Sequence, residues 1–299
     1  MQQQHSVNAF SNSDSWVILS DIEQSIKRKI EAVGTPLKDW DINIYRGVLT
    51  GCNEAFIIST EKRNEILANC ESEDERKRTD ELIRPILRGR DIKKYGYDWA
   101  DLWLIWVPWH FPLHFDESIQ GASKIAEDKF RSQYPSVYSY LSRYKKQLSA
   151  RNKAETGIRY EWYALQRWGA KYWDDFSKPK VMYSETNDYY NTKIAFDIKG
   201  FLTDKTCFFV VGERIEWIYF FMCSKIFTHF MQNTSPCLGS SGISLTGISV
   251  EKFPVPKFSS KQAEVFTTLL QQNDFSSLNC AVYELYGLSQ NEIEFIENQ

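Results

Sequence analysis

Hydrophobic residues recur along this chain with two different spacings, one helical and one strand-like. Ile22, Ile26 and Ile30 predict a helix over 21–31, with Ser20 or Asp21 as its cap. Residues 42–49 and 55–59 have the pattern of strands on either side of a turn at 47–51. Further strands are expected at 102–107, 180–184, 193–198 and 206–211, the last of them buried.

The remaining helices and loops follow from the longer apolar and polar stretches. Helices are expected at 61–69, from Pro135 to about Lys153, and over 217–231, which is apolar nearly all round and hence buried. Residues 71–80 are almost all charged and should be exposed, whereas the Gly- and Ser-rich stretch 236–247 predicts a loop. The tail has the pattern of short helices, with Gly287 as a helix stop.

These elements predict an α+β fold, in which a mixed β-sheet is accompanied by helices and a C-terminal helical tail. Residues 1–14 are polar and are expected to be frayed or disordered. Residues 15–258 are expected to form one domain, and 259–299 the helical tail.

Composition narrows the class of protein. The chain has 299 residues, of which 42% are hydrophobic, enough to fill a sizeable core. Aromatic residues make up 15%, with ten Trp, and these suit cores, interfaces and base stacking. Six Cys without metal-ligand spacing and the lack of a signal-peptide pattern indicate reduced thiols in a cytoplasm. Because 217–231 is short and contains Lys225 and His229, no membrane span is expected.

Charge is distributed unevenly, although the net charge is only −3. Residues 124–153 contain eight Lys or Arg against two acidic residues, a sum of +6. Residues 259–299 contain one Lys against six acidic residues, a sum of −5. A basic stripe in mid-chain is typical of a face that meets phosphate, and equally of a solvated helix beside an acidic terminal helix.

Catalytic and metal-binding patterns are weak. Asp116 with 127–129 is the one candidate for a metal-dependent nuclease, and acidic–x–Lys spacing arises easily by chance. His110 and His114 have metal-like spacing, but Pro112 disturbs it, and His229 fits a core position. We therefore assign no catalytic residue and no metal ligand, and predict that this chain alone is not an enzyme.

Two segments, 45–56 and 83–95, place cationic and amide side chains beside glycines, between apolar anchors. A loop needs this combination to bring Arg, Thr and Asn against a polyanion at close range. With them stand, in chain order, the segments 27–40, 134–151, 160–168, 176–181, 253–256 and 282–289. From about Ser15 to the end, the order of these segments resembles the C-terminal specificity region of TaqI-like adenine DNA methyltransferases and of type II (IIG-like) restriction–modification enzymes.

The resemblance implies a target-recognition domain, which chooses the DNA sequence while another domain methylates or cleaves. In this family an Asn/Asp/Ser-Pro-Pro-aromatic motif holds the target adenine, yet no two prolines are adjacent here and no GxGxxG occurs. S-adenosylmethionine is thus expected in a parent or partner adenine-N6 methyltransferase, possibly with a nuclease. The chain would be a fragment, a separate specificity subunit or a split-gene remnant, with the acidic tail and 283–296 as candidate docking surfaces.

Roles in DNA binding follow from side-chain chemistry. Arg46, Arg88 and Arg90 can fork onto phosphate or guanine, and Asn53 can pair with adenine. Thr50, with the backbone at Gly47, Gly51 and Gly89, can reach phosphate oxygens. Sequence-independent phosphate contacts are expected from Lys93, Lys94, Lys145, Lys146, Lys178 and Lys180. The predicted DNA-binding set also includes Arg84 and Arg151.

Each motif has a structural alternative. Segment 46–53 could be a tight turn that Thr50 ties and Asn53 caps, and Arg84 could pair with Asp91. The bases would then be read from 109–123, 187–193 or 235–247. Tyr160, Trp162 and Trp168 fit either sugar and base contacts or core packing. Two other classes also stay open: an RNA- or single-strand-binding protein, and a protein-interaction scaffold.

Overall fold

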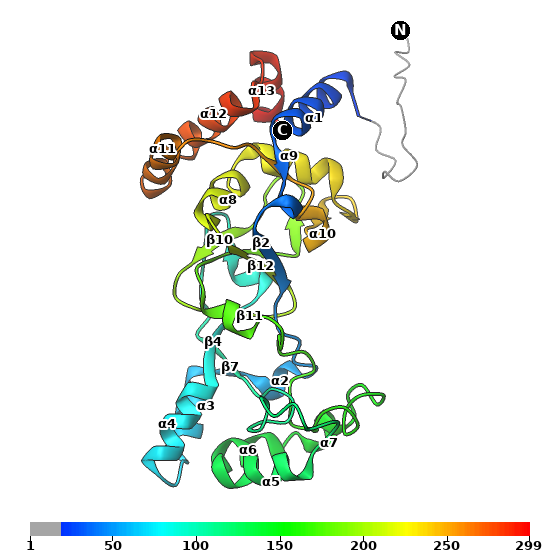
Figure 1. Cartoon of the computed structure of the whole chain (residues 1–299), viewed down its shortest axis with the longest axis vertical. Helices are drawn as coiled ribbons and strands as arrows, with labels where there is room; N and C mark the ends of the chain where they lie inside the picture. The colour runs from blue at the N-terminus through cyan, green and yellow to red at the C-terminus, as the bar shows by residue number, and fades with distance from the viewer. Residues whose placement is uncertain (1–18) are drawn as a thin grey trace.

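The computed structural model describes residues 19–299, which form an elongated α+β molecule (Figure 1). The predicted frayed start at 1–14 lies outside the described residues. The helices are α1 (Asp21–Val33), α2 (Asn53–Phe56), α3 (Thr60–Ala68), α4 (Glu73–Leu82), α5 (Lys124–Gln133), α6 (Pro135–Ser142), α7 (Lys145–Ser149), α8 (Ile215–Met222), α9 (Lys225–Thr234), α10 (Gly247–Val250), α11 (Ser260–Gln271), α12 (Phe275–Tyr286) and α13 (Gln290–Glu297). Short 3-10 turns are η1 (Leu37–Asp39), η2 (Gly89–Asp91) and η3 (Trp173–Ser177).

The strands form several small sheets. They are β1 (Thr35–Pro36), β2 (Ile42–Arg46), β3 (Ile57–Ser59), β4 (Ile83–Leu87), β5 (Ile92–Lys93), β6 (Gly96–Tyr97), β7 (Leu102–Ile105), β8 (Lys180–Ser184), β9 (Thr186–Asp188), β10 (Ile194–Asp197), β11 (Leu202–Thr203), β12 (Cys207–Gly212), β13 (Cys237–Leu238), β14 (Gly242–Ser244) and β15 (Pro254–Val255). Two four-stranded sheets have the orders β10-β8-β12-β2 and β11-β4-β7-β3.

The sheet β10-β8-β12-β2 separates two hydrophobic cores. Because successive side chains on a strand point to opposite faces, Met182 and Phe209 enter one core while Val181 and Val210 enter the other. We call the first the lower core, which also holds α2–α6 and the sheet β11-β4-β7-β3, and the second the upper core, which holds α1, α8, α9 and α11–α13 (Figure 1). This sheet has no solvent face along β8, where all five residues are buried.

Helices at both chain ends close the upper core. Helix α1 begins with the expected Ser20 cap, in a reciprocal arrangement with Glu23, and it packs on α12 and α13. Gly287 ends α12 with φ 63°, as a glycine C-cap does. The side chains of Val282 and Ile296 enter the same core as Ile26. The domain boundary at 258/259 stays a prediction.

Two expected helices are each divided. The apolar stretch 217–231 lies in α8 and α9, because Ser224 caps a new helix by accepting from the Phe227 N–H. The stretch 135–153 contains α6 and α7, with a break at 143–144. In 217–231, apolar character on all sides hides the break, since the Ser224 cap interrupts the helix without interrupting burial.

Three further expectations are corrected. Residues 55 and 56 belong to α2, and the expected strand is only β3. The stretch 71–80 is not uniformly exposed: the Glu75 carboxylate is buried and accepts from the N–H groups of Glu71 (2.7 Å) and Ser136 (2.9 Å). The expected loop at 236–247 contains β13 and β14, which pair with each other, and β14 also pairs with β9. No helix within 19–299 is long and apolar enough to cross a membrane.

Candidate nucleic-acid interface

The turn at 203–206, from the end of β11 to the start of β12, joins the two glycine-containing segments. Val48 N–H donates to the Thr203 carbonyl (2.8 Å), and Gly89 N–H donates to the Thr206 hydroxyl (2.8 Å). The Thr206 N–H in turn donates to the Asp204 carboxylate (3.0 Å), whose pKa is raised by burial. Segments more than a hundred residues apart in sequence thereby meet at one place.

Gly47 and Gly89 serve this junction and not a phosphate. Both are buried, and a Cβ on Gly47 would collide with the carbonyl oxygens of Thr203 and Asp204. A Cβ on Gly89 would lie 2.9 Å from the Ser184 hydroxyl. The predicted contact of these two backbones with phosphate is therefore wrong, because both N–H groups donate within the protein. Gly51, by contrast, is exposed with φ 74°.

Arg46, at the end of β2, lies beside Lys205. Its Nε donates to the Lys205 carbonyl (2.8 Å), and its Nη2 pairs with Glu185 (2.5 Å). The guanidinium also lies 5.4 Å from the centroid of the Phe208 ring, and the side chain is 51% exposed. Lys205 is exposed as well. Arg46 and Lys205 thus present positive charge at the junction. Lys205 is not among the residues that the sequence predicted to bind DNA.

The loop after Arg46 is a tight turn that Thr50 ties. The Thr50 side chain is buried and donates to the Asn53 Oδ1 (2.6 Å), while accepting from the Cys52 N–H (3.2 Å). The structural alternative therefore holds for Thr50, which does not reach outward. Asn53 begins α2 and is exposed, and within residues 19–299 its Nδ2 has no hydrogen-bond partner.

Arg151 holds this loop from behind. It donates to the carbonyls of Thr50 (2.6 Å), Trp162 (2.7 Å), Ala164 (2.8 Å) and Leu148 (3.0 Å). Four of its five N–H groups are therefore occupied by protein carbonyls. Burial lowers the pKa of Arg151. Its predicted contact with DNA is replaced by a role in positioning the loop.

An open cleft of about 610 Å³ lies between the loop and α7. Three amide side chains line it, those of Asn53, Gln147 and Gln166, together with Lys205. We call it the amide cleft. Carboxamides can donate and accept toward a base edge at once, and a lysine beside them suits a phosphate.

The second glycine-containing segment presents one free arginine. Arg88 forms a two-point ion pair with Asp91, at 2.9 and 2.8 Å, and this contact raises the pKa of Arg88. Arg90 is exposed, and Lys93 donates to the Arg90 carbonyl (2.9 Å). Arg84 is half-buried, donates to the Gly200 carbonyl (3.4 Å), and has its pKa lowered by burial. The alternative Arg84–Asp91 pair is wrong, because Asp91 pairs with Arg88.

The predicted lysines are scattered over the molecule. Lys180 is wholly buried and pairs with Asp197 (2.5 Å), so the prediction that it contacts phosphate is wrong. Lys178 pairs with Asp175 (2.6 Å) beside acidic residues, and Lys94 lies 5.2 Å from the Tyr95 ring. Lys145 and Lys146 are exposed on α7, next to Gln147. The structure thus places Arg46, Asn53 and the lysines of α7 in one region. Lys94, Lys178 and Lys180 lie elsewhere.

The aromatic and histidine candidates are mostly interior. Tyr160, Trp162 and Trp168 are buried, which assigns them to core packing. Glu161 accepts from the His110 ring (3.0 Å), and burial lowers the pKa of His114. His229 is buried and bonds Gln299 (3.0 Å). Within 19–299 no three His, Cys, Asp or Glu side chains are arranged to hold a metal ion.

Comparisons with known proteins place this fold. No family model matches the chain, and no curated protein matches it. Several solved structures resemble it, and two are described here. One is the type IIL restriction–modification enzyme MmeI in complex with DNA, with 14% identity and a TM-score of 0.57 over 88% of this chain and 36% of that one. The other is the type IIG restriction endonuclease BpuSI, with 11% identity and a TM-score of 0.50 over 93% of this chain and 32% of that one.

The likeness shows a shared fold. At these identities it does not carry the activity of either enzyme to this chain. The chain spans about a third of the length of each neighbour. The sequence did not indicate Lys205, Gln147 and Gln166, because a single lysine or glutamine has no local signature. Their grouping depends on the pairing of β11 with β4 and of Leu49 with Arg167.

Proposed function

We propose that this chain is the DNA target-recognition module of a type II restriction–modification system. The observation that carries the proposal is the amide cleft, where Asn53, Gln147 and Gln166 lie beside Lys205. Support comes from the fold, which is similar to part of a restriction–modification enzyme solved in complex with DNA. The finer resemblance to TaqI-like specificity regions, given by the order of the sequence segments, agrees with this role.

In this proposal the cleft reads base edges and its rim holds the backbone. Asn53 and the two glutamines form paired hydrogen bonds with adenine in the major groove. Lys205, Arg46 and the lysines of α7 contact phosphates and set the register. Arg151 keeps the loop at 50–53 in one shape, so that little conformational freedom is lost on binding.

Catalysis belongs to another part of the system. We propose that adenine-N6 methylation, with S-adenosylmethionine, and any cleavage are carried out by a domain or subunit outside this chain. The sequence has neither a pair of adjacent prolines nor a glycine-rich nucleotide turn to hold the base or the cofactor. This chain would contribute the choice of sequence.

Selection from a randomised duplex pool tests the proposal. We expect one enriched site whose preference persists as salt rises from 50 to 200 mM, and loss of preference at one base pair in Asn53→Ala. The matched control is Asn43→Ala, since Asn43 is also exposed but lies at the opposite end of β2. It should select the same site as the unmodified chain.

Three other results would contradict the proposal or its reading surface. Tighter binding of single-stranded DNA or RNA than of any duplex would favour a single-strand-binding protein. No nucleic-acid binding even at low salt would favour a protein-interaction scaffold. Duplex binding in which Asn53→Ala and Asn43→Ala select identical sites would remove the amide cleft as the reading surface.

A further inference from the structure

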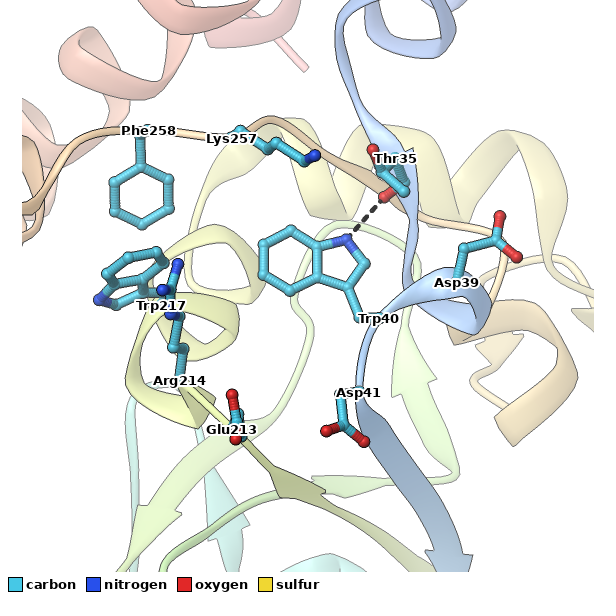
Figure 2. A pocket seen from close by; sticks show the side chains of 9 residues that line it. All are labelled: Thr35, Asp39, Trp40, Asp41, Glu213, Arg214, Trp217, Lys257 and Phe258. Atoms are coloured by element: carbon cyan, nitrogen blue, oxygen red, sulfur yellow. Dashed lines mark hydrogen bonds between the residues drawn. The ribbon is translucent and has the colours of Figure 1, made fainter.

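A second cavity lies at the opposite end of β2 and β12 from the amide cleft. It has a volume of about 440 Å³ and is bounded by the residues before β2, the turn after β12, helix α8 and the segment after β15. Figure 2 shows the side chains that line it. We call it the aromatic cavity. Its lining residues are Thr35, Asp39, Trp40, Asp41, Glu213, Arg214, Trp217, Lys257 and Phe258.

Aromatic rings form two of its walls. The Trp40 ring is fixed by its Nε1, which donates to the Thr35 carbonyl (3.0 Å). The Trp217 ring packs against Phe258 with ring centroids 4.4 Å apart. In Figure 2 the open space lies between these walls, with the Asp41 and Glu213 carboxylates below it. Indole faces attract cations, and they attract them more strongly where water is partly excluded.

The carboxylates of the cavity have no protein partner in the part of the chain that the structure describes. Within residues 19–299, no hydrogen bond or ion pair engages the side chains of Asp39, Asp41 or Glu213. An adjoining hollow shares Asp41, Glu213 and Arg214. The aromatic cavity itself has three acidic residues, Asp39, Asp41 and Glu213, against the two basic residues Arg214 and Lys257. This net charge disfavours a phosphate-bearing ligand and favours a cation.

The turn that carries two of these residues has an unusual backbone. Arg214 has φ 53° and is the N-cap residue of α8, where its side chain makes no capping hydrogen bond. Gly212 has φ 148°, and a Cβ there would collide with the Asp41 carbonyl. A non-glycine residue in the left-handed region is uncommon, and it persists where the surrounding packing holds it. The turn therefore holds Glu213 and Arg214 at the mouth of the cavity.

We propose that the aromatic cavity binds an arginine side chain presented by a protein partner. The guanidinium lies between the Trp40 and Trp217 walls and forms ion pairs with Asp41 and Glu213. The Trp217 ring already holds the Arg214 guanidinium, 4.4 Å from its centroid, which shows that an indole of this cavity takes a guanidinium. The partner's arginine takes the Trp40 side of the space. A planar guanidinium also fits paired carboxylates better than an ammonium does. This inference goes beyond DNA recognition and does not depend on it.

Titration with an arginine–glycine repeat peptide tests the site. The readout is the indole N–H resonances in NMR spectra of the full chain, with Trp40 and Trp217 assigned from the variants Trp40→Phe and Trp217→Phe. We expect these two resonances to shift with the arginine peptide and not with the same peptide made with citrulline. A lysine–glycine peptide should bind at least about threefold more weakly.

Charge variants separate this site from general attraction. Asp41→Asn and Glu213→Gln should each weaken the arginine peptide about fivefold or more, whereas Glu216→Gln, outside the cavity, should change its affinity less than twofold. Duplex binding should be unchanged in Asp41→Asn, and peptide binding unchanged in Lys205→Ala, so the two proposals fail independently. Equal losses in Glu213→Gln and Glu216→Gln would overturn the site. So would equal binding of the citrulline peptide, or shifts of both indoles by adenosine monophosphate but not by arginine.

Discussion

The two ends of the β2–β12 strand pair differ in chemistry although they belong to the same two paired strands. One end has the amide cleft, with Asn53, Lys205 and Arg46. The other has the aromatic cavity, with the Asp39, Asp41 and Glu213 carboxylates and two indole rings. Five residues of β2 pair with β12, so the ends are separated by about 14 Å along the strand. Opposite charge at the two ends suits two different partners that bind at the same time.

The comparison requires that the sheet between the two ends be buried on both faces. The variant Lys180→Met tests this burial, and it should give the largest change in the free energy of unfolding. Removing the ammonium leaves the Asp197 carboxylate buried without its counter-charge. We expect the free energy of unfolding in urea to fall by about 3–5 kcal/mol. Adding Asp197→Asn should recover part of the loss.

The control for this experiment is Lys178→Met, two residues away but exposed. It should change the free energy of unfolding by less than about 0.5 kcal/mol. If Lys180→Met were as stable as the unmodified chain and bound DNA more weakly, Lys180 would lie at the surface, as its sequence context suggests.

As pH falls, the upper core should lose stability before the lower core does. Burial alone would raise the pKa of Glu292, but hydrogen bonds from Lys29, Ser25 and Ser289 outweigh it and bring that pKa to about 2, against the usual 4.5. A carboxylate with a lowered folded pKa stabilises the fold above its unfolded pKa and loses that contribution as pH falls. We expect about 3 kcal/mol to be lost between about pH 5 and pH 2.

Hydrogen exchange locates this loss. Amides of α1 and α13 should lose protection at pH 3 relative to pH 6, while those of β4 and β7 keep theirs. Glu292→Gln should abolish most of the difference between the two pH values. Equal loss in both cores would contradict the assignment of this acid sensitivity to Glu292.

Sequence patterns predicted much of the scaffold. The Ser20 cap, the Lys180–Ser184 strand and the Gly287 stop are confirmed because each depends on local chemistry. The α+β class is confirmed as well. The break at Ser224 has a local cap signal, but it was hidden within a stretch whose burial is continuous.

The candidate site was much less predictable. Lys180 looks like any surface lysine, and only the pairing of β8 with β10 places Asp197 beside it. Gly47 was correctly singled out as a site of close backbone approach, yet the approaching group is the chain's own turn at 203–206. Which partner a glycine or a charge meets is a tertiary property, and a single sequence does not contain it.

Alanine variants of the two glutamines test whether the amide cleft reads bases, with a smaller expected effect. Gln147→Ala and Gln166→Ala should each cost about 1–3 kcal/mol of discrimination at one base pair. Competition binding with single-base variants of the selected duplex measures this. Gln271→Ala, exposed on α11 in the upper half, is the control and should leave every preference unchanged. Identical profiles for all three variants would remove the glutamines from base reading.

Two lysines, one at each end of the strand pair, should differ in their effect on the salt dependence of duplex binding. This is the smallest effect that we expect. Lys205 lies at the amide cleft, and Lys178 lies beside the acids at the other end. Lys205→Ala should weaken all duplexes alike and reduce the slope of log affinity against log salt by about 0.9, the value for one phosphate contact. Lys178→Ala should leave the slope unchanged. The reverse result would place the DNA at the acidic end.

A sheet with a core on each side leaves its strands little freedom to vary. Any substitution in β8 or in the buried part of β12 changes the volume of one core or the other, whichever face its side chain takes. The segments beyond the strand ends are not under this restriction. New binding preferences in such a molecule would therefore arise by exchange of the loops at 50–53 and 213–214, with the sheet inherited unchanged.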